Sequence, residues 1–158
     1  MSNIQWMYGE EPKNLPDEWK EKIKSMFLNE TGEEYTLESL SNLPIPKWSG
    51  NMLLINQDEY PASDSIVGVL WALPHEINGV RIAAFVLEAK HQSSGWGGKA
   101  WQHLVEISRT AGKSTIQLEV KAENKRAQGF YKARGLEVVR HLPHYYSSGI
   151  GYEMKGPI

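Results

Sequence analysis

The glycine-rich segment Gln92–Lys99 divides the chain into two halves with different hydrophobic patterns. Before it, one amphipathic helical stretch is followed by apolar runs of strand length, and turn residues such as the Asn78–Gly79 pair separate these runs. After it, a helical pattern, an extended run and a second helical pattern follow one another. The first half therefore predicts a meander of neighbouring strands, and the second half predicts a strand, helix, strand, helix succession.

The expected elements are bounded by apolar spacing, turn residues and helix caps. The expected strands are Asn3–Tyr8, Met52–Gln57, Ser65–Leu73, Val80–Glu88, Thr115–Ala122, Leu136–Arg140 and Gly151–Lys155. The expected helices are Leu15–Asn29, Thr36–Leu43, Gly95–Ala111 and Asn124–Arg134. An irregular connection is expected over His141–Ile150.

Length and composition are those of an ordinary globular protein. The 158 residues suit one compact domain, residues 1–158, and 41% hydrophobic against 23% charged residues suit a packed core. A net charge of −2 argues against nucleic acid or an anionic membrane as partner. The chain has no cysteine, no signal-peptide pattern at its start and no apolar run of membrane-spanning length. We therefore expect a cytoplasmic protein, and the sequence leaves monomer or homodimer open.

The segment Gln92–Lys99 is a candidate anion site. It joins an expected strand to an expected helix, so backbone N–H groups lie at a helix N-terminus, where the helix dipole favours negative charge. Its glycines let the backbone approach a phosphate closely. A P-loop does not fit, because Ser93 stands where its first glycine is required and Ala100 follows the lysine in place of Ser or Thr. A glycine-rich turn without a ligand is the simpler alternative.

A dinucleotide fingerprint is the stronger rival for the same segment. Gly95, Gly97 and Ala100 satisfy its pattern, and Glu119 follows at about the spacing of a ribose-binding acid. However, Ala89–Ser94 separate the first glycine from the strand, and the expected strands before the loop are not those of a dinucleotide domain. A nucleotide-binding oxidoreductase is therefore kept as an alternative.

Three later residues offer chemistry, each beside a plain structural explanation. Glu119 lies on one face of its strand with Gln117 and Lys121, a face that is equally well explained as solvated. Tyr131 lies on the apolar side of the last helix, where core packing explains it as well. Asn124 is a good N-cap for that helix and needs no ligand.

Together these segments resemble the GNAT superfamily of N-acetyltransferases. Gln92-x-x-Gly95-x-Gly97 is similar to its acetyl-CoA loop, and Asn124-x-x-Ala127-x-x-Phe130-Tyr131-x-x-x-Gly135 is similar to its second signature. Leu118–Asn124 and the Tyr145–Tyr146 pair also resemble the ribosomal-protein alanine and protein N-terminal acetyltransferase branch. The resemblance spans about Val80 to Met154. It implies the GNAT fold: an α/β (α+β) chain with one mixed, mostly antiparallel sheet of about six to seven strands, about four flanking helices, and a splay between the fourth and fifth strands.

The resemblance also implies roles for individual residues. Glu119 is expected to be the general base and Tyr131 the general acid. Asn124 and Tyr131 are expected to contact the CoA part of acetyl-CoA. The other expected cofactor-binding residues are Phe85, Val86 and Leu87, which pair with the pantetheine arm, and Gln92, Ser93, Ser94, Gly95, Trp96, Gly97, Gly98 and Lys99 around the diphosphate.

Some positions depart from the family pattern. Ser93 and Ser94 stand where basic residues are frequent, so we expect diphosphate binding to depend on backbone donors and Lys99. Arg81 occupies the place of the strand glutamate of histone-type members, which leaves Glu119 as the better base. The five histidines show no metal-ligand spacing, and no metal is expected.

The expected function is acetyl transfer from acetyl-CoA directly to a primary amine, most of all a protein or peptide N-terminus. The aromatic candidates for binding that acceptor are Tyr35, Trp48, His144, Tyr145 and Tyr146, with loop packing as the plain alternative. A small-molecule amine as acceptor and a non-catalytic CoA-binding module are the remaining alternatives.

Overall fold

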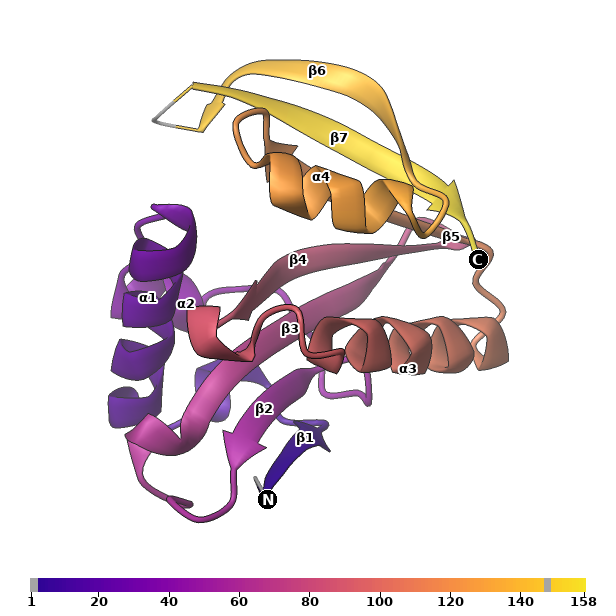
Figure 1. Ribbon diagram of the computed structural model, residues 1–158. Helices are drawn as coiled ribbons and strands as arrows, with labels where there is room; N and C mark the ends of the chain where they lie inside the picture. The colour runs from indigo at the N-terminus through magenta and orange to yellow at the C-terminus, as the bar shows by residue number, and fades with distance from the viewer. Residues whose placement is uncertain (1–2, 147–148) are drawn as a thin grey trace. The chain divides into compact units, whose positions relative to one another are not determined.

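The computed structural model describes residues 3–146 and 149–158. Its strands are β1 (Ile4–Tyr8), β2 (Met52–Asn56), β3 (Ile66–His75), β4 (Gly79–Leu87), β5 (Thr115–Lys121), β6 (Glu137–Tyr146) and β7 (Gly149–Pro157) (Figure 1). Its α-helices are α1 (Asp17–Thr31), α2 (Leu37–Ser41), α3 (Trp96–Thr110) and α4 (Lys125–Lys132), and short 3-10 turns are η1 (Pro12–Asn14), η2 (Ser63–Ser65) and η3 (Ala89–His91). None of the helices in the described ranges is both long and apolar enough to cross a membrane.

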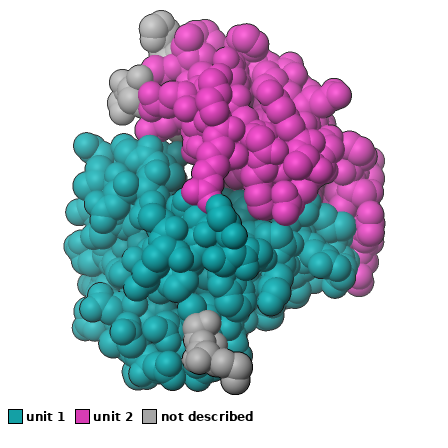
Figure 2. Space-filling model, in the orientation of Figure 1, with its two compact units in different colours: residues 1–73, 84–107 teal, residues 74–83, 108–158 magenta. Residues whose placement is uncertain are grey.

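The strands form one mixed sheet in the order β1-β2-β3-β4-β5-β7-β6. β4 and β5 are parallel and pair only from Gly79–Thr115 to Ile82–Leu118, whereas β5 with β7 and β7 with β6 are antiparallel. The expected mixed sheet, its strand and helix numbers and the splay between the fourth and fifth strands are confirmed. The chain divides into two compact units, Met1–Leu73 with Ala84–Ile107 and Pro74–Ala83 with Ser108–Ile158 (Figure 2).

In the first unit, helices cover both faces of the β1–β3 sheet. Neighbouring residues of a strand point to opposite faces. Leu54 packs in a cluster with Trp96 at the start of α3, whereas Leu53 lines a cavity together with Trp19 of α1. α1 buries Ile23, Met26 and Phe27 in the core. The helix is capped at its C-terminal end by Gly32, whose φ of 72° is the left-handed conformation that glycine adopts without strain. The apolar residues whose spacing predicted this helix therefore form its buried face.

In the second unit, β5 lies between β4 and β7, and α4 follows it directly. Ile116, Leu118 and Val120 are buried, as the alternation predicted. Lys121, on the face for which a solvated position was one of two explanations, is also buried. Gln128 of α4 donates through Nε2 to the backbone oxygens of Lys121 and Ala122, which fastens the helix to the end of the strand.

The last hairpin differs from the sequence expectation. His141–Ile150 was expected to be irregular, but β6 continues to Tyr146 and β7 begins at Gly149. Pro143 cannot donate a ladder hydrogen bond, and the pairing register shifts between Leu142 and Tyr146 to accommodate it. Pairing with β7 therefore overrides the local signal of the proline.

Replacing Gly156 with alanine is expected to destabilise the protein by about 1–3 kcal/mol. A Cβ at this position of β7 would lie 2.5 Å from the backbone oxygen of Gly135, which cannot move away like the end of a side chain. Gly129→Ala is the matched control, because a Cβ there meets nothing within 4 Å and alanine favours the helix by up to about 1 kcal/mol. Urea unfolding measures both, and a Gly156→Ala variant as stable as the wild type would refute the close approach.

Candidate active site

The glycine-rich loop of the first unit is held in place at both ends. On the strand side, Gln92 donates through Nε2 to the backbone oxygen of Leu87 at 2.8 Å, across the 3-10 turn η3. On the helix side, the indole N–H of Trp6 donates to the backbone oxygen of Trp96 at 3.1 Å. Ser93 and Gly95 take φ values of 62° and 90°, which are left-handed and cost a non-glycine residue strain. The loop therefore has a defined shape, and this shape requires a positive φ at Ser93 that a serine rarely adopts.

Helix α1 supports the same loop. Glu30 accepts from the backbone N–H of Ala89 at 3.2 Å, and Lys22 forms an ion pair with Glu88 at 3.4 Å. These two contacts fasten the turn η3, which leads into the loop, to a helix of the same unit. The carboxylates of Glu30 and Glu88 are thus both engaged by protein groups.

The start of α3 has the character of an anion site. Lys99 N–H donates to the oxygen of Gly95, so the N–H groups of Trp96, Gly97 and Gly98 belong to the first turn, where no intrahelical acceptor exists. No acidic side chain lies in that turn. Its partial positive charge is therefore not neutralised by the helix itself. The residues present fit a diphosphate bound through the backbone.

Few side-chain charges add to this backbone site. The ammonium of Lys99 lies 4.7 Å from the centre of the Trp96 ring, so the two side chains stack against each other. Burial, together with the charge of Lys90, lowers the pKa of His91 below its ordinary value, against an opposing effect of Glu88. His91 is therefore neutral at pH 7. Among residues 89–99 the cationic side chains are therefore those of Lys90 and Lys99.

The β4 residues Phe85, Val86 and Leu87 lie outside the pairing of β4 with β5. Val86 is buried, whereas Phe85 and Leu87 are half-buried, as alternation along a strand requires. The backbone oxygen of Leu87 is already an acceptor for Gln92. Pairing of these residues with a pantetheine arm stays a prediction.

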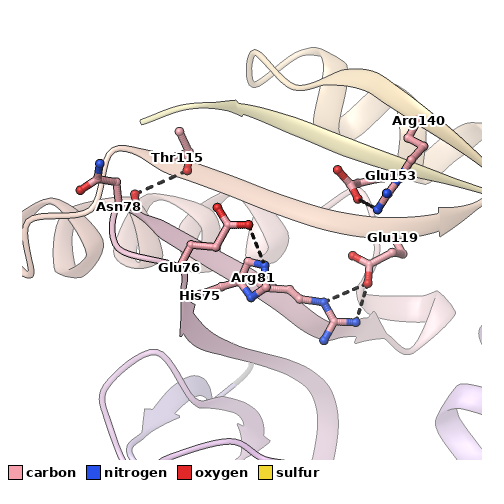
Figure 3. Close-up of polar contacts among 8 residues, drawn as sticks. All are labelled: His75, Glu76, Asn78, Arg81, Thr115, Glu119, Arg140 and Glu153. Atoms are coloured by element: carbon pink, nitrogen blue, oxygen red, sulfur yellow. Dashed lines mark hydrogen bonds and ion pairs between the residues drawn. The ribbon is translucent and has the colours of Figure 1, made fainter.

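In the second unit, Glu119 is held by an arginine from the neighbouring strand. Arg81 donates to Glu119 Oε1 from Nε at 2.9 Å and from Nη2 at 2.5 Å (Figure 3). The side chain of Glu119 is 12% exposed and that of Arg81 is 32% exposed. A guanidinium can only donate, so Glu119 Oε1 is the acceptor in both hydrogen bonds. Arg81 thereby fixes the position of the carboxylate.

A second carboxylate lies beside Glu119 across the sheet. Glu119 is the cross-strand partner of Glu153, and Arg140 of the edge strand β6 donates to Glu153 Oε1 at 2.6 Å (Figure 3). Like charges directly opposite each other destabilise a sheet. Here each carboxylate has its own arginine, one from either side. The result is a charge row across four strands: Arg81, Glu119, Glu153 and Arg140.

Helix α4 positions the other two predicted residues of this unit. Asn124 caps the helix, since its Oδ1 accepts from the N–H of Ala127 at 3.1 Å. This contact leaves the Nδ2 donors of the amide unused by the cap. Tyr131 is 7% exposed and packs edge-on against Phe130 with ring centroids 5.5 Å apart. The capping explanation of Asn124 is confirmed, and contacts of either residue with CoA stay predictions.

The acceptor candidates of the first unit are already engaged in packing. The indole N–H of Trp48 donates to the backbone oxygen of Ala72 at 2.7 Å, and its ring covers Gly50. Tyr35 lies edge-on to Phe27 at 5.0 Å. The side chains of His144, Tyr145 and Tyr146 lie outside the described part of the structure; their backbone belongs to β6. The loop-packing explanation therefore accounts for Trp48 without an acceptor.

Sequence reasoning missed the partners of Glu119. Arg81 had been noted only as a departure from the family pattern, and Glu153 and Arg140 had no expected role. The period-two alternation placed Glu119 on one face of its strand, but only the parallel register of β4 and β5 brings Arg81 beside it. Among the described residues, no group of three or more His, Asp or Glu side chains is arranged to hold a metal ion.

The chain is similar in sequence to one family. The model of the acetyltransferase (GNAT) family matches residues 10–136. No curated protein matches the chain in sequence.

Solved structures share its fold along nearly the whole length. Ard1 from Thermoplasma volcanium has a TM-score of 0.78 at 19% identity, covering 98% of this chain and 97% of that chain. The ribosomal-protein-S18-alanine N-acetyltransferase from Escherichia coli has a TM-score of 0.74 at 16% identity, covering 98% and 94%. Naa50 from Arabidopsis thaliana, in complex with the bisubstrate analogue CoA-Ac-MVNAL, has a TM-score of 0.73 at 16% identity, covering 98% and 99%. At such identities the likeness is one of fold.

Proposed function

Because the chain belongs to the acetyltransferase (GNAT) family, we propose that it transfers an acetyl group from acetyl-CoA directly to the α-amine of a protein or peptide. Family membership makes it an acyltransferase and removes the dinucleotide oxidoreductase as an alternative. The observation that supports the proposal best is the Glu119 carboxylate, which two hydrogen bonds from Arg81 hold in place on β5. An amine attacks a thioester only when it is neutral, so the reaction needs such a proton acceptor.

In the proposed reaction, the amine nitrogen forms a bond to the acetyl carbon, and the bond between that carbon and the CoA sulfur breaks. Glu119 takes the proton of the attacking amine, directly or through a water molecule. Tyr131 donates a proton or a hydrogen bond to the departing thiolate. No acyl-enzyme is needed, which suits a chain without cysteine.

Binding of CoA is assigned to the backbone of the loop. The first-turn N–H groups of α3 and the side chain of Lys99 bind the diphosphate. Ser93 and Ser94 add no positive charge to this binding. Phe85–Leu87 and the Nδ2 group of Asn124 bind the pantetheine arm. The CoA-containing analogue bound to Naa50 supports acetyl-CoA as donor.

The acceptor class is supported by the names of the structural relatives. The enzyme from Escherichia coli is by its name an N-acetyltransferase for an alanine of ribosomal protein S18, and the analogue in Naa50 contains a peptide, MVNAL. A small-molecule amine is the competing acceptor, because Trp48 and Tyr35 are used in packing and leave few aromatic side chains in the described residues to frame a peptide.

A panel of amines tests this proposal through release of free CoA thiol. Acetyl-CoA is supplied with peptides of varied first residue, polyamines, aminoglycosides and amino acids, and each peptide is also supplied with its N-terminus already acetylated. We expect release with free peptides and none with blocked ones. Release with polyamines or aminoglycosides alone would establish the small-molecule alternative, and binding of acetyl-CoA without any release would mean a non-catalytic module.

Replacing Arg81 with leucine is expected to lower kcat by roughly tenfold to a hundredfold and to leave the KM for acetyl-CoA nearly unchanged. The reason is that Glu119 loses the contact that fixes its position, and small misplacements of a catalytic group are costly. Arg81 acts through Glu119 and is a positioning residue. Steady-state kinetics measure the effect for Arg81→Leu, for the conservative Arg81→Lys and for the matched control Arg140→Leu. The control removes the arginine that contacts Glu153.

Arg81→Lys is expected to recover part of the rate, since an ammonium still donates to Glu119. Arg140→Leu is expected to stay within about threefold of the wild type, because the loss falls on the neighbouring carboxylate. Equal losses for Arg81→Leu and Arg140→Leu, or a loss that follows unfolding alone, would show that Arg81 only stabilises the sheet.

A further inference from the structure

The first unit contains a cavity of about 420 Å³ that no part of the proposed mechanism uses. It lies among the start of α1, the end of β1, the beginning of β2, the middle of β3 and the segment Tyr60–Pro61. Its size is in the range of small-molecule sites. None of the residues assigned above to CoA, to proton transfer or to the acceptor lines it.

One residue of the cavity lining has a buried amide oxygen without a hydrogen-bond partner among the described residues. Asn51 is 2% exposed and lines the cavity. Its Nδ2 donates to the backbone oxygen of Pro46 at 2.6 Å, and because that oxygen can only accept, the orientation of the amide is fixed. The other atom, Oδ1, is buried and has no hydrogen-bond partner among the described residues. A buried acceptor of this kind is stabilised by a donor, and a ligand can supply one.

Aromatic rings with fixed orientations form the walls. The indole N–H of Trp19 donates to the backbone oxygen of Pro61 at 3.0 Å, and the Trp19 and Tyr60 rings meet edge-on at 6.0 Å. Tyr8 stacks on His103 at 4.1 Å. Trp71 forms part of the wall and is almost fully buried. Tyr8 and Tyr60 are both exposed, so the rim of the cavity is apolar as well.

The charge of the lining is negative. Glu10 and Glu18 both line the cavity, and no lysine, arginine or histidine does. Neither carboxylate forms an ion pair within residues 3–146 and 149–158. An amide oxygen, two carboxylates and the faces of aromatic rings all attract a positively charged N–H donor and repel an anion.

We propose that this cavity is a second binding site, for a small organic ammonium ion with an apolar or aromatic body. The ammonium donates to Asn51 Oδ1 and is attracted by Glu10 and Glu18, while the body packs among Trp19, Tyr60 and Trp71. The site is separate from acetyl transfer and needs no acetyl-CoA. Occupancy stabilises the first unit by mass action.

Three probes with the same aromatic body and different charges test the proposal at pH 7 without acetyl-CoA: 2-phenylethylammonium, 2-phenylethanol and phenylacetate. Calorimetry measures affinity, and two-dimensional NMR follows the Asn51 side-chain NH₂ and the Trp19 indole N–H. We expect the ammonium to bind and to shift both signals. We expect the alcohol to bind at least several-fold more weakly and phenylacetate not to bind.

The double variant Glu10→Gln/Glu18→Gln is expected to weaken ammonium binding roughly fivefold to tenfold. Both side chains are exposed, so the fold is retained. Asp17→Asn is the matched control, since it removes a charge from the same turn of α1 at a position that does not line the cavity, and it is expected to leave the affinity unchanged. Equal binding of the three probes, no binding of the ammonium, an unaffected double variant, or shifts confined to Glu119 and the Gln92–Lys99 loop would each overturn the proposal.

Discussion

Replacing Glu119 with glutamine is expected to lower kcat by about 10²- to 10⁴-fold, the range that general base catalysis contributes. Glutamine has nearly the same shape, and its amide oxygen can still accept from Arg81, so the side chain keeps its place. What is lost is the ability to take a proton. The KM for acetyl-CoA is expected to change little, because the glycine-rich loop is untouched. Stopped-flow or steady-state measurement of CoA thiol release gives both constants.

The pH dependence of the Glu119→Gln deficit is a second readout. Peptide α-amines have ordinary pKa values of about 7.7–8.0, so more of the acceptor is neutral above pH 8. The reaction rate then depends less on a base that removes the proton from the amine. The deficit is therefore expected to shrink as the pH rises from 6.5 to 9. Glu153→Gln is the matched control, as the cross-strand neighbour with its own arginine, and should keep kcat within about threefold. A fully active Glu119→Gln enzyme would remove Glu119 from the mechanism.

Replacing Tyr131 with phenylalanine is expected to lower kcat by roughly 10²-fold, at the lower end of the general acid range. The variant loses only a hydroxyl, and the ring keeps its edge-on packing against Phe130. Without a phenol to protonate or hydrogen-bond it, the CoA thiolate is a poorer leaving group. Binding of acetyl-CoA, measured by calorimetry, should stay within about threefold.

Tyr152→Phe is the control for this variant, because Tyr152 is a phenol of the same unit that lies on β7, beside His141, and has no assigned role. Its kcat should match the wild type. If Tyr131→Phe retains full activity, its hydroxyl serves packing alone. If both Tyr131→Phe and Glu119→Gln do so, the role assignment as a whole is wrong.

The sequence predicted the elements whose signals are local. Ile23, Met26 and Phe27 recur at helical spacing, and Gly32 ends their helix with a left-handed cap. Asn124 caps α4 through a residue three positions away. In each case the atoms that decide the structure lie within one or two turns of each other. Local spacing is therefore enough to place them.

Local sequence patterns did not predict contacts between residues that lie far apart in the sequence. Arg81 and Glu119 lie 38 residues apart in sequence and meet only through the register of two parallel strands. Lys20 is buried although its side chain is charged, because its ammonium donates to the Lys13 backbone oxygen and to Ser41 Oγ. Trp48 was placed among acceptor residues, yet its indole N–H finds a backbone acceptor on β3. Pairing partners of this kind depend on the tertiary fold.

Transfer of isotope-labelled acetyl from acetyl-CoA to a peptide with a free N-terminus and one internal lysine tests the central claim most directly. Tandem mass spectrometry locates the label, with the Glu119→Gln enzyme as the matched sample. The proposed function predicts label on the α-amine with the wild type and at least a hundredfold less with Glu119→Gln. Label on the lysine alone, hydrolysis of acetyl-CoA without labelled peptide, or equal labelling by both enzymes would contradict it.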